Sequence, residues 1–81
     1  MGDTMNEKRR NTLRNAMDLL TRASIIVDSV CDEESDAMDN IPENLQGTER
    51  YEAMEDAIDC LNEASEKIEE ARECIEQAIR G

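Results

Sequence analysis

The sequence contains no histidine, phenylalanine or tryptophan, and only one tyrosine and one proline among its 81 residues. Without histidine, the chain lacks the side chain that most often acts as a general acid or base, and its cysteines have no histidine partner. Without large aromatic residues, a core must be built from Leu, Ile, Met, Val and Ala, which are typical of helix bundles. These absences argue against an enzyme and against a β-sheet.

Cysteine is scarce as well: Cys31, Cys60 and Cys74 are odd in number and form no Cys-x-x-Cys pair. This excludes a disulfide framework and a zinc site, and it fits a reducing compartment. No apolar run approaches the ~20 residues that a membrane span needs, and the charged start lacks the apolar core of a signal peptide. The sequence therefore predicts a soluble, cytoplasmic protein without a cofactor, a metal or a membrane contact.

Two segments repeat apolar residues in steps of three and four, which is the pattern of a helix that packs along one stripe. We name the two rows a and d, as in a heptad. In the first segment, row a holds positions 13, 20, 27, 34 and 41, and row d holds 16, 23, 30 and 37. In the second segment, row a holds positions 54, 61, 68 and 75, and row d holds 57, 64, 71 and 78. Only Glu34 interrupts them. Thr4 and Glu7 form a capping box that predicts the first helix start, Pro42 ends that helix, and Thr48 caps the second.

The short connection between the two segments forces the helices to lie antiparallel. When positions whose numbers sum to 91 are paired, alanine mostly meets a larger residue, as in Ala16 with Ile75. The sequence predicts a single all-α domain over residues 1–81: an antiparallel two-helix hairpin with an alanine-rich coiled-coil seam. Helix one is expected at about 4–39, the connection at 40–47 and helix two at about 48–80. Gly47 is expected to adopt a left-handed backbone, and Leu45 to cover the last layer.

Apolar residues also lie beside the predicted seam, and a lone hairpin would leave them in water. Pairing of two hairpins into a four-helix bundle would cover them, so we expect a homodimer or a higher homo-oligomer. The candidate oligomer interface consists of Met17, Leu19, Ile26, Met38, Ile58 and Ile79.

Polar residues replace the hydrophobic ones in the middle of one flank, where Ser24, Ser65 and Arg72 are expected to lie together. They form either a wetted, register-fixing layer or a pocket in which Arg72 and the hydroxyls hold a small anionic nucleotide.

Acidic residues gather at the connection end, where Arg50 is the only basic residue among eleven carboxylates outside the predicted seam, between residues 28 and 59. This sign excludes direct binding to nucleic acid but permits a basic protein partner. A solvated face that keeps the chain soluble is the alternative. The carboxylates at 52, 55, 56 and 59 point outward from the seam, so they are not expected to bind a metal. The candidate partner surface consists of Glu43, Asn44, Gln46, Glu49, Glu52, Glu55 and Asp56.

The chain resembles small acidic helical-hairpin proteins of Firmicute genomes and their phages. Residues 6–28 and 42–71 carry the resemblance, and its most distinctive part is "PENLQG", Pro42 to Gly47, with Tyr51. The resemblance implies an accessory protein of a mobile element. Two functions follow: a non-catalytic interaction or assembly module that binds a partner protein, or an anti-defence protein that sequesters a small anionic nucleotide signal or mimics nucleic acid.

Overall fold

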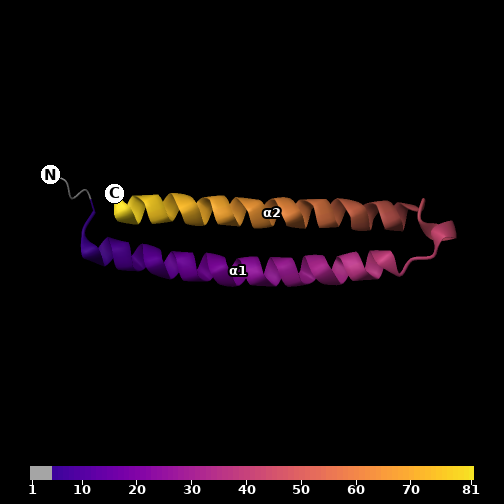
Figure 1. Cartoon of the computed structure of the whole chain (residues 1–81), viewed down its shortest axis with the longest axis horizontal. Coiled ribbons are helices and arrows are strands. Elements are labelled where there is room, and N and C mark those ends of the chain that lie inside the picture. The colour runs from indigo at the N-terminus through magenta and orange to yellow at the C-terminus, as the bar shows by residue number, and fades with distance from the viewer. Residues whose placement is uncertain (1–4) are drawn as a thin grey trace.

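The computed structural model describes residues 5–81 and consists of two long helices that lie side by side and run in opposite directions (Figure 1). Helix α1 spans Glu7–Asp39, helix α2 spans Glu49–Arg80, and a short 3₁₀ helix, η1, spans Glu43–Leu45 between them. The molecule is a rod of 65 × 16 × 13 Å, with the start of α1 and the end of α2 at one end and the connection at the other. The predicted all-helical hairpin is confirmed, and the described residues include no strand.

Local side-chain signals set the helix ends. Asn6 precedes α1, and its side-chain oxygen accepts a hydrogen bond of 2.9 Å from the backbone N–H of Arg9. The predicted cap at Thr4 lies outside the described residues. The hydroxyl oxygen of Thr48 accepts from the backbone N–H of Tyr51 at 3.3 Å, which confirms Thr48 as the N-cap of α2. Helix α1 ends at Asp39, three residues before Pro42, as expected from the restriction that proline imposes on the residue before it.

The connection reverses the chain without a left-handed residue. Gly47 has no positive φ, so the expectation of a left-handed backbone there is wrong. The reversal instead uses 3₁₀-type hydrogen bonds, from Leu45 N–H to the Pro42 carbonyl at 2.9 Å and from Gln46 N–H to the Glu43 carbonyl at 3.2 Å. Leu45 also differs from expectation, because 46% of it stays exposed instead of covering the last layer of the seam.

Replacement of Gly47 by alanine is therefore expected to be tolerated. A Cβ atom built on Gly47 meets no atom within 4 Å, and the backbone conformation suits any residue. Because alanine restricts the unfolded chain more than glycine does, Gly47→Ala should raise the free energy of unfolding by about 0.4–1 kcal/mol. Thermal melting followed by circular dichroism measures this change. A clear loss of stability would show that the connection needs a conformation that only glycine adopts.

The contact stripe between the helices is rotated relative to the predicted seam. In the d row, Val30 is 46% exposed, and Ala37 and Ala78 are exposed too. The e row, which lies on the other side of the a row, takes their place: Cys31 is buried, and the rest are half-buried. Its members are Arg10, Met17, Ser24, Cys31 and Met38 in α1, and Tyr51, Ile58, Ser65, Arg72 and Ile79 in α2. The hairpin thus packs through its a and e rows, with the d row contributing at positions 16, 23, 57, 64 and 71.

Side-chain size explains this rotation. The e row offers methionines and isoleucines, whereas the d row is mostly alanine, and burial of a larger apolar side chain removes more surface from water. A straight helix of 3.6 residues per turn also drifts by about 20° per heptad, which moves the d row out of contact toward the end of α1. The longitudinal register agrees with the predicted one: Arg10 bonds the Ile79 carbonyl at 3.0 Å, and Ser65 bonds Asp28 at 2.8 Å. The residue numbers of these two pairs sum to 89 and 93, and the predicted register pairs positions whose numbers sum to 91.

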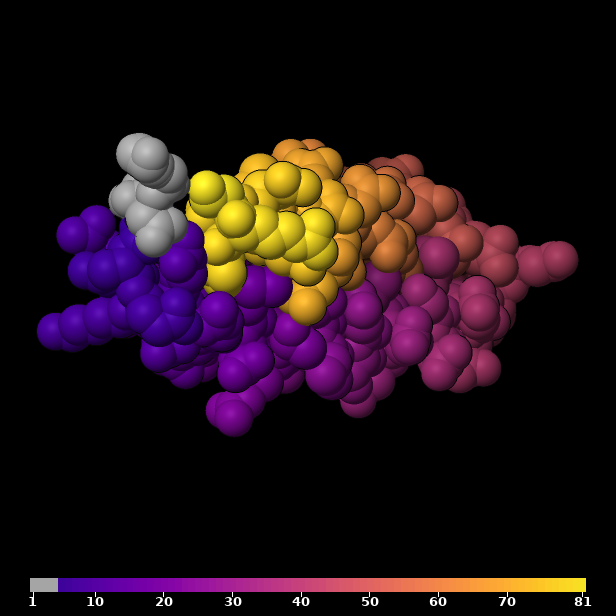
Figure 2. Space-filling model, turned by 60° about the vertical axis from the view of Figure 1, so that its left-hand side comes forward, coloured from indigo at the N-terminus to yellow at the C-terminus, as the bar shows by residue number. Residues whose placement is uncertain are grey.

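The core is small. Among the described residues, only Cys31 and Met54 are buried, with 7% and 9% of their surface exposed. In the space-filling view, the side chains of α2 lie directly against those of α1, and others project from the outer edges of the rod (Figure 2). Four large apolar residues of α1 are left exposed: Leu19, Ile25, Ile26 and Val30. In its described part, the chain has no helix that is both long and apolar enough to cross a membrane.

Candidate functional site

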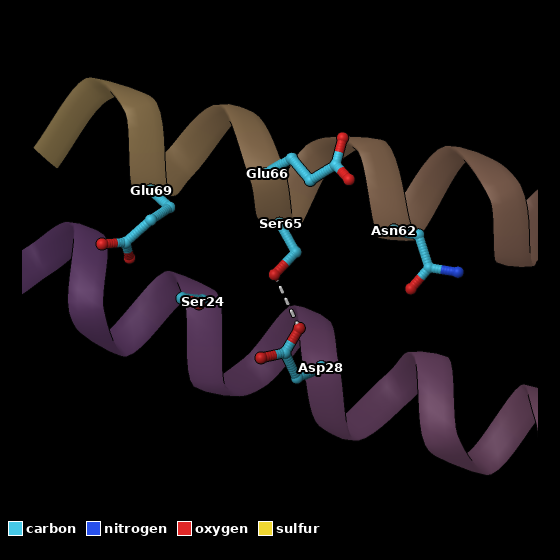
Figure 3. Close-up of a pocket in the computed structure, with 6 residues that line it drawn as sticks. All are labelled: Ser24, Asp28, Asn62, Ser65, Glu66 and Glu69. Atoms are coloured by element: carbon cyan, nitrogen blue, oxygen red, sulfur yellow. Dashed lines mark hydrogen bonds between the residues drawn. The ribbon is translucent and has the colours of Figure 1, made fainter. Parts of the chain in front are cut away.

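A polar hollow lies between the helices near the middle of the rod. It has a volume of about 590 Å³ and is lined by two serines, one asparagine and three carboxylates (Figure 3). Its members are Ser24, Asp28, Asn62, Ser65, Glu66 and Glu69. The Ser65 hydroxyl donates a hydrogen bond of 2.8 Å across the helices to Asp28, and the Cys31 thiol donates to the Asn62 side-chain oxygen at 3.5 Å. These two bonds join α1 to α2 along one side of the contact stripe.

The predicted anion pocket is only partly assembled. Ser24 and Ser65 line the same hollow, as expected, but Arg72 does not line it. Its guanidinium donates from Nη1 to both carboxylate oxygens of Glu69, at 3.1 and 3.4 Å, while its buried Nε has no hydrogen-bond partner. Three carboxylates thus face the hollow, and the nearby cation is already paired. The negative charge of the hollow disfavours an anionic ligand, because no unpaired positive side chain lines the hollow to compensate the charge of the ligand.

The hollow is no metal site either. Within residues 5–81, no group of three or more cysteine, aspartate or glutamate side chains is arranged to hold a metal ion. The serine hydroxyls have no histidine beside them, since the chain has none. A nucleophile and a base in hydrogen-bond reach are the minimum for covalent catalysis, and the hollow offers only carboxylates as bases. The arrangement is that of a polar layer inside a helical pair.

The predicted oligomer interface divides into two groups. Met17, Met38, Ile58 and Ile79 are half-buried in the e rows, so the hairpin itself uses them. Leu19 and Ile26 are 56% and 63% exposed, as a surface for a second chain requires. Sequence reasoning missed Val30, which it placed in the seam, and Ile25, which is 64% exposed.

The connection end is strongly acidic, and among the described residues the carboxylates of residues 28–59 form no ion pair. Residues 28–63 contain thirteen acidic residues and one basic residue, Arg50, which gives a net charge of −12. The other described residues contain seven acidic and eight basic side chains, a net charge of +1. The ion pairs of the described residues involve Glu7, Glu63, Glu69 and Glu76, all outside residues 28–59. All members of the predicted partner surface are exposed: Glu43, Asn44, Gln46, Glu49, Glu52, Glu55 and Asp56.

An apolar hollow that could not be predicted from the sequence lies within this acidic end. It has a volume of about 410 Å³, and Ile41, Pro42 and Leu45 form its apolar part. Asn40, Thr48 and Arg50 complete the lining. It exists because the 3₁₀ turn holds Leu45 away from the seam, leaving its side chain 46% exposed beside the end of α1. The end of the rod therefore combines a negative field with a place for an apolar side chain.

No protein-family model matches the chain, and neither the curated proteins nor the solved structures contain a significant match.

Proposed function

We propose that the protein is a non-catalytic interaction module that self-associates and binds a basic protein surface through its connection end. The observation that carries this proposal is the charge of that end: a net −12 over residues 28–63, with the carboxylates of residues 28–59 free of ion pairs. A patch of one sign attracts a partner of the opposite sign and selects against others. The apolar hollow at Leu45 adds a site for an apolar side chain of the partner.

A protein surface that itself binds nucleic acid is the best-matched class of partner. Such a surface carries clustered Lys and Arg that neutralise regularly spaced phosphates. An acidic helical rod presents carboxylates at regular intervals along one end, so it supplies a comparable field. The same sign disfavours contact between this end and nucleic acid.

Self-association is supported by how much surface the hairpin leaves in water. The chain exposes 6065 Å², whereas a compact protein of 9.2 kDa exposes about 4,900 Å². The radius of gyration is 18.5 Å, against about 12 Å for a compact fold of this length. The excess, roughly 1,100 Å², exceeds the ~800 Å² per partner of a standard interface. A four-helix bundle of two hairpins would cover much of this surface, including Leu19, Ile26 and Val30 of α1.

Neutralisation of the connection end tests the partner proposal. The variant Glu52→Gln/Glu55→Gln/Asp56→Asn removes three exposed charges there, and the control Glu66→Gln/Glu70→Gln/Glu73→Gln removes three exposed charges from the other half of α2. Because exposed ion pairs contribute about 0.2–1 kcal/mol each, three lost pairs should weaken partner binding about tenfold.

The measurement is recovery of cross-linked partners from cells that express each form, followed by titration of the recovered protein. We expect the control to bind as the unmodified protein does, and binding to fall with rising salt. Equal binding by both triple variants, or recovery of no partner by the unmodified protein, would contradict the proposal.

A further inference from the structure

We infer that a second copy docks end over end on one defined face of the hairpin, so that the two acidic ends point in opposite directions. This inference rests on the self-association proposed above and adds its face, its orientation and a consequence. The face is named here the docking stripe and consists of Leu19, Ala23, Ile26 and Val30 on α1.

The docking stripe is a continuous apolar row. Its members follow one another at steps of four, three and four residues, which places them on one side of a helix. Leu19, Ile26 and Val30 are 56%, 63% and 46% exposed, and Ala23 is half-buried at the edge of the hairpin contact. A contiguous exposed apolar row of this kind marks a surface for interaction with another apolar surface.

Helix α2 contributes to the same side of the rod. The bonds from Ser65 to Asp28 and from Cys31 to Asn62 place the polar hollow on one side of the contact stripe. The g row consists of the positions three residues after each d position. Because the helices are antiparallel, the d and g rows of both helices lie on the side of the rod opposite the polar hollow. On α2 these positions hold the small residues Ala57, Cys60, Ala64, Ala71 and Cys74, with the exposed Lys67 at the centre. The docking stripe thus continues into a surface of alanine and exposed cysteine that Lys67 interrupts.

The position of the stripe favours a symmetric dimer. Its centre, between Ala23 and Ile26, lies close to the middle of α1 (Glu7–Asp39). A two-fold axis through this centre, perpendicular to the rod, overlaps the two hairpins over nearly their full length. It brings Leu19 against Val30 of the second copy, and Ala23 against Ile26 of the second copy. Each contact then sets a larger residue against a smaller one, which fills a helix interface without voids.

Charge determines the orientation. Two hairpins that point the same way would place one end of net charge −12 directly beside another. The end-over-end arrangement sets each acidic end beside the half of the partner that carries +1. Lys67 lies near the axis on α2 and is already paired with Glu63 at 3.7 Å, so its approach to the second Lys67 is partly compensated. Electrostatic repulsion therefore selects the end-over-end dimer.

The consequence is a bivalent module. The acidic ends lie at opposite ends of a four-helix rod whose length is that of the hairpin, 65 Å. One dimer then bridges two basic surfaces, or two sites on one oligomeric partner, and gains affinity from the second contact.

The docking face is tested by two neighbouring isoleucines. Ile25 and Ile26 are 64% and 63% exposed, but lie about 100° apart around α1. Ile26→Glu places a charge in the docking stripe, and Ile25→Glu adds the same charge outside it. Sedimentation equilibrium at equal protein concentrations is expected to show that Ile26→Glu weakens the dimer at least tenfold, whereas Ile25→Glu leaves it nearly unchanged. A dimer intact in Ile26→Glu would overturn this choice of face.

The orientation is tested by the two exposed cysteines, Cys60 and Cys74. In the end-over-end dimer, Cys60 of one copy lies close to Cys74 of the other, because the axis crosses α2 near Lys67. Two identical cysteines are then separated along the rod by 14 residues, roughly 21 Å. Cys60→Ser and Cys74→Ser each leave one exposed cysteine, and the buried Cys31 stays in both. With a short bismaleimide, neither variant alone should form a covalent dimer, and an equal mixture should.

The results separate the inference from the proposed function. If the unmodified protein is a monomer at tens of micromolar, both the self-association and the inference fail. If it is a dimer that Ile25→Glu breaks and Ile26→Glu does not, the self-association stands and the face is wrong. If each single-cysteine variant forms a covalent dimer on its own, the copies point the same way, and the bivalent module is refuted.

Discussion

Met54→Ala is expected to lower the free energy of unfolding by about 2–4 kcal/mol, the usual cost of truncating a buried methionine. Met54 is one of only two buried residues in the described part of the chain, with 9% of its surface exposed. A domain of this length has a total stability of roughly 4–12 kcal/mol. The loss is therefore a large share of the whole, and it should lower the melting temperature by about 10 °C or more.

The matched control is Leu45→Ala, which also truncates an apolar side chain near the connection. Leu45 is 46% exposed, so its truncation should cost less than ~1 kcal/mol. Urea unfolding followed by circular dichroism gives both values, at one fixed protein concentration because dimerisation adds to the apparent stability. Equal losses for the two variants would mean that Leu45 covers the last layer, as the sequence suggests, and that the helix ends pack differently.

The hairpin was predictable because local signals agree with the long-range pattern. Thr48 caps α2 through its own hydroxyl, Pro42 restricts the residue before it, and the heptad rows fall on two segments joined by a short connection. Each signal depends only on residues close in sequence or on a fixed period. The register also follows, since a connection of fixed length leaves little freedom along the rod.

The rotation of each helix about its own axis was not predictable in the same way. A heptad pattern identifies an apolar stripe along a helix. The e and d rows, however, flank the a row at only 40° and 60° around the helix. The sequence prediction placed the e row on a flank that a second hairpin would cover, although Met17 and Ile58 in this row gain more from burial within the hairpin than alanine does. Which row is buried depends on the apolar surface summed over the whole row. A pattern of individual apolar positions does not give this sum.

The candidate site likewise has parts that could be predicted from the sequence and a part that could not. The acidic end could be found by counting charges, because its carboxylates are exposed and need no particular geometry. The anion pocket was disfavoured by a local competitor: Glu69 lies three residues before Arg72, a spacing at which opposite charges meet on one helix face. That signal was present in the sequence. The hollow at Leu45 had no such signal, because it depends on the 3₁₀ turn.

Replacement of both hollow-lining serines, Ser24→Leu/Ser65→Leu, is expected to stabilise the hairpin by about 1–2 kcal/mol. Both serines are half-buried between the helices, in the row that also holds Met17, Met38, Ile58 and Ile79. Two leucines would bury apolar surface worth about 1 kcal/mol each at this exposure. The change removes the bond from Ser65 to Asp28, but Asp28 is exposed and remains hydrated. Thermal melting should show a rise of about 4–8 °C for each kcal/mol.

The control for this variant is Ser29→Leu, which adds the same side chain at an exposed position of α1 and should leave the melting temperature nearly unchanged. A loss of stability in the double variant would mean that the hollow cannot accept two leucines, and that the polar layer is needed for packing. The expected gain has a different meaning: the chain keeps a polar layer at the middle of its seam against its own stability. A single polar layer of this kind can fix the register of paired helices, because a shift would bury its polar groups without partners.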